Sequence, residues 1–214
     1  MNRNRDWIVP LAGVAFVLLM IVGFAVSGEP KSADEPAREI VDYYVDNKDS
    51  VQVGAIIGGI AILMLLVFGA YLRSALRDAG GAGDIWSGLA FAGIVIVAVG
   101  FAVDLTISIA LTEAADDVNP VAVQALQALW DNDFVPIALG VVTFLLGTGI
   151  AVVRSGVLPK WLGWLMIVLV IVGVTPLGFV SAIAAGLLVG VLGILLALRA
   201  RRPAAPSGGA APAA

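Results

Sequence analysis

The sequence predicts an all-α fold, a polytopic membrane helix bundle of six transmembrane helices with both termini cytoplasmic. Of its 214 residues, 60% are hydrophobic and only 13% are charged, and the mean hydropathy is +1.03. This composition lies far outside the range of soluble globular domains. Apolar runs of about 20 residues, the length needed to cross a bilayer, alternate with polar breaks, and most basic residues fall on one side of this layout.

Six apolar runs are predicted to cross the membrane within a single domain, residues 1–202. Their approximate ranges are 8–26, 51–72, 85–111, 134–153, 161–176 and 179–198. The fifth is short because Thr175-Pro176 ends it, so it is expected to thin the bilayer or to be sheltered by its neighbours. Residues 203–214 are rich in Pro, Ala and Gly and are predicted to form a disordered cytoplasmic tail.

The first apolar run has two interpretations. Ala25-Val26-Ser27 resembles the small-residue cleavage site of a signal peptide. The run is nevertheless longer than the roughly 7–15 apolar residues of a signal peptide. It is therefore interpreted as a retained membrane anchor.

The distribution of Lys and Arg predicts the orientation of the bundle. Nine of the 12 basic residues fall on the side of the termini, namely Arg3, Arg5, Arg73, Arg77, Arg154, Lys160, Arg199, Arg201 and Arg202. The other three, Lys31, Arg38 and Lys48, lie in the first loop of the opposite side. Cytoplasmic loops carry the excess of basic residues, so both termini are predicted to be cytoplasmic.

The two long outer loops are acidic, and each is predicted to contain a short amphipathic helix on the membrane surface. In residues 28–50, apolar side chains recur at helical spacing from Ala37 to Tyr44, and Asp34 is a candidate cap. In residues 112–133, Asn119-Pro120 has the pattern of a cap followed by a first-turn proline.

Asp104 is the one formally charged side chain inside the predicted spans. At helical spacing it shares a face with Gly93, Val97, Gly100 and Ser108. Because an acid in hydrocarbon costs roughly 2.5–3.5 kcal/mol on insertion scales, Asp104 is expected to face the interior of the bundle in its protonated form. The two glycines should let another helix approach this face closely.

Asp104 is the centre of a candidate intramembrane polar site. Ser108, Gln52, Thr143 and Ser181 are at depths from which they are expected to reach it. One interpretation is a packing role, in which Asn would replace Asp104 without loss and Leu would lower stability. The other is a proton, cation or ligand site. No second ionisable group within the spans offers itself as a relay partner.

The sequence shows no catalytic, cofactor-binding or metal-binding constellation. It has no Cys and no His, and it lacks a glycine-rich phosphate loop. Asp116-Asp117 and the pair Asp131 and Asp133 could converge on a divalent cation, but their spacing differs from that of an EF-hand, so a solvated acidic surface is preferred. Residues 6–10 and 133–136 are weakly similar in sequence. An inverted repeat of three plus three spans is therefore an open alternative.

The segment Gly156-Val-Leu-Pro-Lys-Trp-Leu-Gly-Trp164 resembles an uncharacterised family of six-span bacterial membrane proteins. In that family a basic-flanked Leu-Pro-x-Trp-Leu-Gly segment opens the fifth span. The resemblance implies six spans with this orientation in a bacterial plasma membrane. It implies no catalytic or binding residue, because the family is a domain of unknown function.

These observations favour a non-catalytic membrane protein that binds a hydrophobic ligand or a membrane-protein partner. The alternative is a small proton- or cation-coupled transporter that uses Asp104, and a membrane enzyme has the least support. The lipid bilayer is the expected surrounding, and no nucleic-acid partner is expected. The oligomeric state is left open.

Overall fold

A computed structural model describes residues 7–80, 83–117, 119–175 and 177–201. All the regular structure in these ranges is helical, which confirms the all-α prediction. The predicted tail, residues 203–214, lies outside the described residues.

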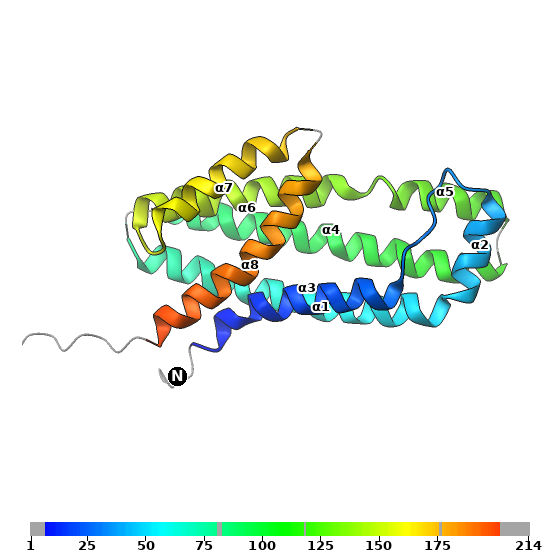
Figure 1. The fold of residues 1–214 in the computed structure, drawn as a ribbon, viewed down its shortest axis with the longest axis horizontal. Helices are drawn as coiled ribbons and strands as arrows, with labels where there is room; N and C mark the ends of the chain where they lie inside the picture. Colours follow the sequence, from blue (N-terminus) through cyan, green and yellow to red (C-terminus); the bar gives the residue numbers. More distant parts are fainter. Residues whose placement is uncertain (1–6, 81–82, 118, 176, 202–214) are drawn as a thin grey trace, which may run out of the picture.

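Six helices pack into a closed ring in which each neighbour in sequence is also a neighbour in space. They are α1 (Ala12–Ser27), α3 (Lys48–Asp78), α4 (Gly83–Asp117), α6 (Phe134–Ser155), α7 (Lys160–Gly173) and α8 (Gly178–Ala200), and a short 3-10 helix, η1 (Val9–Leu11), precedes α1. α8 closes the ring by packing against α1 and η1. Two further helices, α2 (Ala37–Asp46) and α5 (Pro120–Trp130), lie together at one end of the bundle (Figure 1).

Five helical segments in the described ranges are long and apolar enough to cross a membrane, which supports a multi-pass membrane protein. α7 is apolar but shorter, at 14 residues, or about 21 Å. The last turn of α7 and the first turn of α8 lie well short of the end of the bundle that carries α2 and α5 (Figure 1). The expected shortness of this segment is therefore confirmed.

α4 and α6 pack closely through glycine. A Cβ atom on Gly93 would overlap the backbone nitrogen of Phe144, and one on Gly140 would lie 2.6 Å from the backbone nitrogen of Val97. One on Gly100 would lie 3.0 Å from the backbone nitrogen of Ile137. The small face predicted on the third apolar run is thus a helix contact, and its partner is α6.

α3 and α4 extend well beyond the predicted spans. With 31 and 35 residues, they are about 46 and 52 Å long, against a hydrocarbon core of about 30 Å. The extension of α4 follows from its sequence, because Ile107, Leu111 and Ala115 continue one apolar face past the predicted boundary at residue 111. Residues 112–117 were predicted to be loop and are helical.

The outer end of α4, the start of α3, α2 and α5 together form a helical cap with its own core. That core contains Ile40, Tyr44, Val51, Ile107, Leu111, Ala115 and Val123. The short helices predicted for the two acidic loops therefore exist, and their most buried apolar side chains, Ile40, Tyr44 and Val123, pack inside the cap.

The capping predictions for these two helices had different outcomes. Asn119 does cap α5, because its side-chain oxygen accepts a hydrogen bond of 2.9 Å from the N–H of Val121. The prediction that Asp34 caps α2 is wrong. Pro36 occupies the N-cap position and α2 has no side-chain cap, since the proline already fixes a backbone conformation from which a helix can start.

The first and last described helices meet at the end of the bundle opposite the cap. The guanidinium of Arg201 lies 3.5 Å from the ring centroid of Trp7, and Arg199 donates a hydrogen bond to the carbonyl of Val157, before α7. The two described ends of the chain thus lie on one side of the bundle.

Candidate functional site

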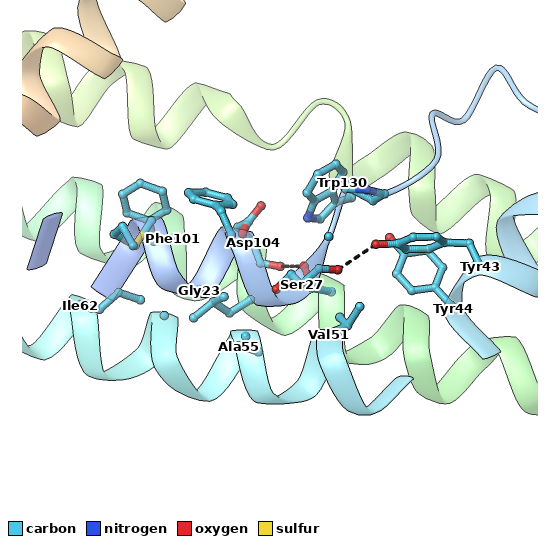
Figure 2. Close-up of a pocket in the computed structure, with 18 residues that line it drawn as sticks. Gly23, Ser27, Tyr43, Tyr44, Val51, Ala55, Ile62, Phe101, Asp104 and Trp130 are labelled. Carbon is cyan, nitrogen blue, oxygen red and sulfur yellow. Dashed lines mark hydrogen bonds between the residues drawn. The ribbon is translucent and has the colours of Figure 1, made fainter. Parts of the chain in front are cut away.

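A cavity of about 90 Å³ lies directly below the cap, in the space between α1, α3 and α4. α1 and α4 both pack against α3, and the cavity occupies the angle between them. Its walls are mainly apolar and its polar groups converge at the cap end (Figure 2). The lining residues are Met20, Gly23, Phe24, Ser27, Gly28, Pro30, Tyr43, Tyr44, Val51, Gly54, Ala55, Gly58, Ile62, Phe101, Asp104, Leu105, Ser108 and Trp130.

Glycines on α1 and α3 bring these two helices close enough to form one wall of the cavity. A Cβ on Gly54 would lie 3.0 Å from the carbonyl of Gly23 and would overlap the hydroxyl of Ser27. Gly58, one turn further along α3, faces the side chain of Leu105 on α4. The Gly54-x-x-x-Gly58 pair thus contacts two different helices.

Asp104 lies on the α4 wall of this cavity and is half-buried. Ser108, one turn further along α4, also lines the cavity and donates a 2.9 Å hydrogen bond to the backbone carbonyl of Asp104. The indole of Trp130 interacts with the Asp104 carboxyl and lies beside it in Figure 2. The expectation that Asp104 faces the interior of the bundle is confirmed.

A second acid, Asp133, lies near Asp104, and the sequence analysis missed this pair. α4 and α6 run antiparallel, and their contacts pair Ala90 with Gly147, Val97 with Gly140 and Gly100 with Ile137. One turn further out, this register places Asp104 opposite Asp133. The two carboxyl groups interact electrostatically. One carboxyl oxygen of Asp133 is buried and has no hydrogen bond within the described residues.

Two tyrosines of α2 and the indole of Trp130 form the roof of the cavity. The hydroxyl of Tyr43 donates to the carbonyl of Ser27 at 2.9 Å, and the hydroxyl of Tyr44 donates to the side-chain oxygen of Gln127 at 2.8 Å. Burial raises the pKa of both tyrosines above the ordinary value, and the increase is larger for Tyr44. Both hydroxyls are thus neutral donors at physiological pH.

The indole N–H of Trp130 is buried and has no hydrogen bond of normal geometry in the described part of the chain. It therefore supplies an unsatisfied donor next to Asp104. An unpaired buried donor costs free energy until a partner reaches it.

The structure does not bring the other predicted site residues to Asp104. Gln52 donates to Thr112 at 3.3 Å and to Glu113 at 2.9 Å, in the cap. Thr143 donates to the carbonyl of Leu139 in its own helix, and Ser181 donates to the carbonyl of Leu169 on α7. Of the predicted set, only Asp104 and Ser108 line the cavity.

The other predicted outer acids lie in the cap. Asp116 accepts a 2.7 Å hydrogen bond from Lys48, and Asp131 accepts hydrogen bonds from Gln127 and from the N–H of Ala33. Among the described residues, no group of three or more acids, Cys or His is placed to hold a metal ion. These acids therefore tie the cap together through ordinary polar contacts.

A second, smaller cavity of about 70 Å³ lies deeper in the bundle, between α1, α3, α4, α6 and α8. Phe101 lines both cavities and lies 6.5 Å from Phe16, measured between ring centroids. Phe101 therefore separates a cavity with polar groups at its outer end from one lined by apolar side chains.

The site is a mainly apolar cavity with a few convergent polar groups, a geometry that is common in small-molecule sites. Among the residues that line this cavity, no nucleophile is hydrogen-bonded to a neighbouring base. Comparisons of the chain with protein-family models, with curated proteins and with solved structures find no match. The resemblance of residues 156–164 to the uncharacterised six-span family stays a prediction.

Proposed function

We propose that this protein is a non-catalytic integral membrane protein that binds a small hydrophobic molecule in the cavity below its cap. The observation that carries the proposal is the cavity itself, in which Asp104 and Trp130 meet apolar side chains of α1, α3 and α4. Its volume of about 90 Å³ exceeds the roughly 10–15 Å³ that a single water needs. Aromatic and aliphatic walls with few polar groups are typical of small-molecule sites.

The proposed setting is a bacterial plasma membrane, with six crossings and both termini in the cytoplasm. In this arrangement α7 is the short fifth crossing, and the acidic cap projects from the outer surface. The excess of Lys and Arg at the end away from the cap supports this orientation.

A cavity-filling variant tests the proposal. The purified protein in phosphatidylcholine nanodiscs is titrated with hexanol and with hexylamine, and binding is followed by the fluorescence of Trp130, which lines the cavity. The Trp130→Phe variant gives the signal of the other tryptophans, which is subtracted. Ala55 lines the cavity, so Ala55→Phe should abolish the binding signal. Ile56, on the same helix, is 66% exposed, so Ile56→Phe should bind as the parent protein does. If neither probe binds the parent protein, the proposal is contradicted.

A second candidate function is proton- or cation-coupled transport. The observation that favours it is the pair of Asp104 and Asp133, since acids within membrane helices often mark ion pathways. Reconstituted in liposomes, such a transporter would show a pH-dependent flux that Asp104→Asn abolishes and that Asp117→Asn, at an exposed position, leaves intact. An equal flux in both variants contradicts this function.

A further inference from the structure

We infer that the ligand of the cavity is an amphipathic amine, with a primary ammonium group at Asp104 and a short apolar chain along α1 and α3. This inference rests on the proposed function and narrows it to one chemical class. It follows from three features of the cavity: the direction of its hydrogen bonds, its charge and its aromatic lining.

Three hydroxyl groups that line the cavity already donate their protons to protein acceptors. Tyr43 donates to Ser27, Tyr44 donates to Gln127 and Ser108 donates to the backbone carbonyl of Asp104. Each hydroxyl oxygen keeps lone pairs that can accept a further hydrogen bond. Together with the carboxyl of Asp104, these oxygens outnumber the donors at the polar end of the cavity, where the indole N–H of Trp130 is the unsatisfied donor. A ligand with several N–H donors satisfies them better than a carbonyl or an ether does.

The charge of the cavity also favours an amine. Asp104 lines it and Asp133 lies opposite Asp104, whereas none of the lining residues is Lys or Arg. Lys48, which lies in the cap, already pairs with Asp116 and Glu113, at 2.7 and 3.6 Å. A cation is therefore favoured and an anion is disfavoured, because an ammonium group beside Asp104 stabilises the carboxylate form that burial alone disfavours.

Aromatic rings line the cap end of the cavity, next to the position of the proposed ammonium group. Tyr43 and Tyr44 meet edge to face with 5.1 Å between ring centroids, and Trp130 lies beside Asp104 (Figure 2). The faces of such rings attract cations. Below them, Met20, Ile62 and Phe101 line the apolar part of the cavity, which suits an alkyl chain.

An ammonium group on an apolar chain also occurs in phosphatidylethanolamine. That headgroup carries a phosphate next to its amine, and the lining residues offer no cation to neutralise it. A free amine is therefore favoured over the lipid. The experiment separates these sources by comparing nanodiscs of phosphatidylcholine alone with nanodiscs that also contain phosphatidylethanolamine.

The test compares hexylamine, hexanol and hexanoate at pH 7.5, with the fluorescence assay described above. A charge-assisted hydrogen bond contributes about 1.5–3 kcal/mol, and 1.4 kcal/mol is a tenfold change in affinity. Hexylamine should therefore bind about tenfold or more tightly than hexanol, and hexanoate should bind weakest. In Asp104→Asn, hexylamine and hexanol should bind within about twofold of each other, while hexanol binding stays unchanged. Phosphatidylethanolamine should not compete with hexylamine.

The outcomes separate the inference from the proposed function. If hexanol binds as tightly as hexylamine, and Ala55→Phe abolishes both, the cavity binds hydrophobic molecules without a preference for amines and the inference is overturned. The inference is also overturned if Asp104→Asn keeps the preference for hexylamine. Competition by phosphatidylethanolamine overturns the assignment to a free amine. If no hexyl probe binds, the proposed function itself fails.

Discussion

Asp104 on α4 lies across the helix interface from Asp133 at the start of α6, in line with the glycine contacts that hold the two helices together. Within the described residues, the Asp104 carboxyl interacts with Trp130 and Asp133 and does not reach Gln52, Thr143 or Ser181. A packing role would require a well-formed network of hydrogen bonds. This arrangement instead favours an acid retained for binding.

Substitutions at Asp104 distinguish the two roles. Asn is nearly isosteric, so Asp104→Asn should change the free energy of unfolding by less than about 0.5 kcal/mol. Asp104→Leu removes a poorly compensated acid from a mainly apolar cavity, so it should keep or raise stability while abolishing hexylamine binding. Thermal unfolding in detergent, followed by tryptophan fluorescence, measures both variants. A loss of about 1–3 kcal/mol in Asp104→Leu would support packing.

Gly93 should be intolerant of any side chain. Its added Cβ would overlap the backbone of Phe144, which cannot move without separating α4 from α6. Gly93→Ala should therefore lower stability by about 1–3 kcal/mol. Gly88, on the same helix, has no atom within 4 Å of an added Cβ. Gly88→Ala should be neutral or stabilising by up to about 1 kcal/mol, because Ala has the higher helix propensity. If thermal unfolding shows an equal loss of stability in Gly93→Ala and Gly88→Ala, the packing of α4 on α6 is contradicted.

The buried hydrogen bond from Tyr44 to Gln127 should stabilise the cap. Tyr44→Phe leaves the Gln127 oxygen without this donor, so the cap should lose about 1–2 kcal/mol, measured as faster hydrogen exchange in α2 and α5. Tyr71→Phe is the matched control, because Tyr71 lies outside the cap. It should leave hydrogen exchange in α2 and α5 unchanged.

Tyr44 also predicts how the stability of the cap depends on pH. Its pKa is raised above the ordinary value of 10.0 by burial and, to a smaller extent, by Tyr43 and Asp131. Below pH 10 the hydroxyl is neutral in both folded and unfolded chains, so its contribution is fully present. As the pH rises further, the unfolded chain ionises first and stability falls. Absorbance at 295 nm follows the ionisation of the Tyr44 hydroxyl. If this ionisation is centred at or below pH 10, the burial of Tyr44 is contradicted.

The orientation can be checked because the chain has no native cysteine. Single cysteines in place of Asp49 and Asp117 lie on exposed positions at the cap end, and cysteines in place of Asp78 and Lys160 lie on exposed positions at the opposite end. An impermeant maleimide added to intact cells should label the first two and spare the last two. Labelling at Asp78 would reverse the proposed orientation.

The sequence predicted most of the bundle, because the length of an apolar run and the spacing of glycines are local properties. The shortness of the fifth run and the close packing at Gly93 and Gly100 were both visible in this way. The end of α4 was placed too early, since hydropathy detects apolar runs and misses helix that continues into the cap with only one apolar face.

The candidate site could be predicted only in part, because it depends on the register between distant helices. Asp104 and Ser108 were found, since both lie on one face of one helix. Asp133 and the aromatic roof were missed because Asp133 was counted as part of an acidic loop, and α2 was expected on the membrane surface. Glycines seven residues apart on both α4 and α6 were a signal that these helices pack closely, but the register that places Asp133 opposite Asp104 is given only by the structure, in which Gly93 meets Phe144 and Gly140 meets Val97.

The most direct test of ligand binding below the cap is protection of a cysteine in its wall. Ser108→Cys is nearly isosteric and lines the cavity, whereas Ser181→Cys is fully buried between α7 and α8 and is the control. N-ethylmaleimide should modify Cys at position 108 and not at position 181, and saturating hexylamine should slow the first reaction about tenfold. Modification at position 108 at the same rate with and without hexylamine would contradict binding in this cavity.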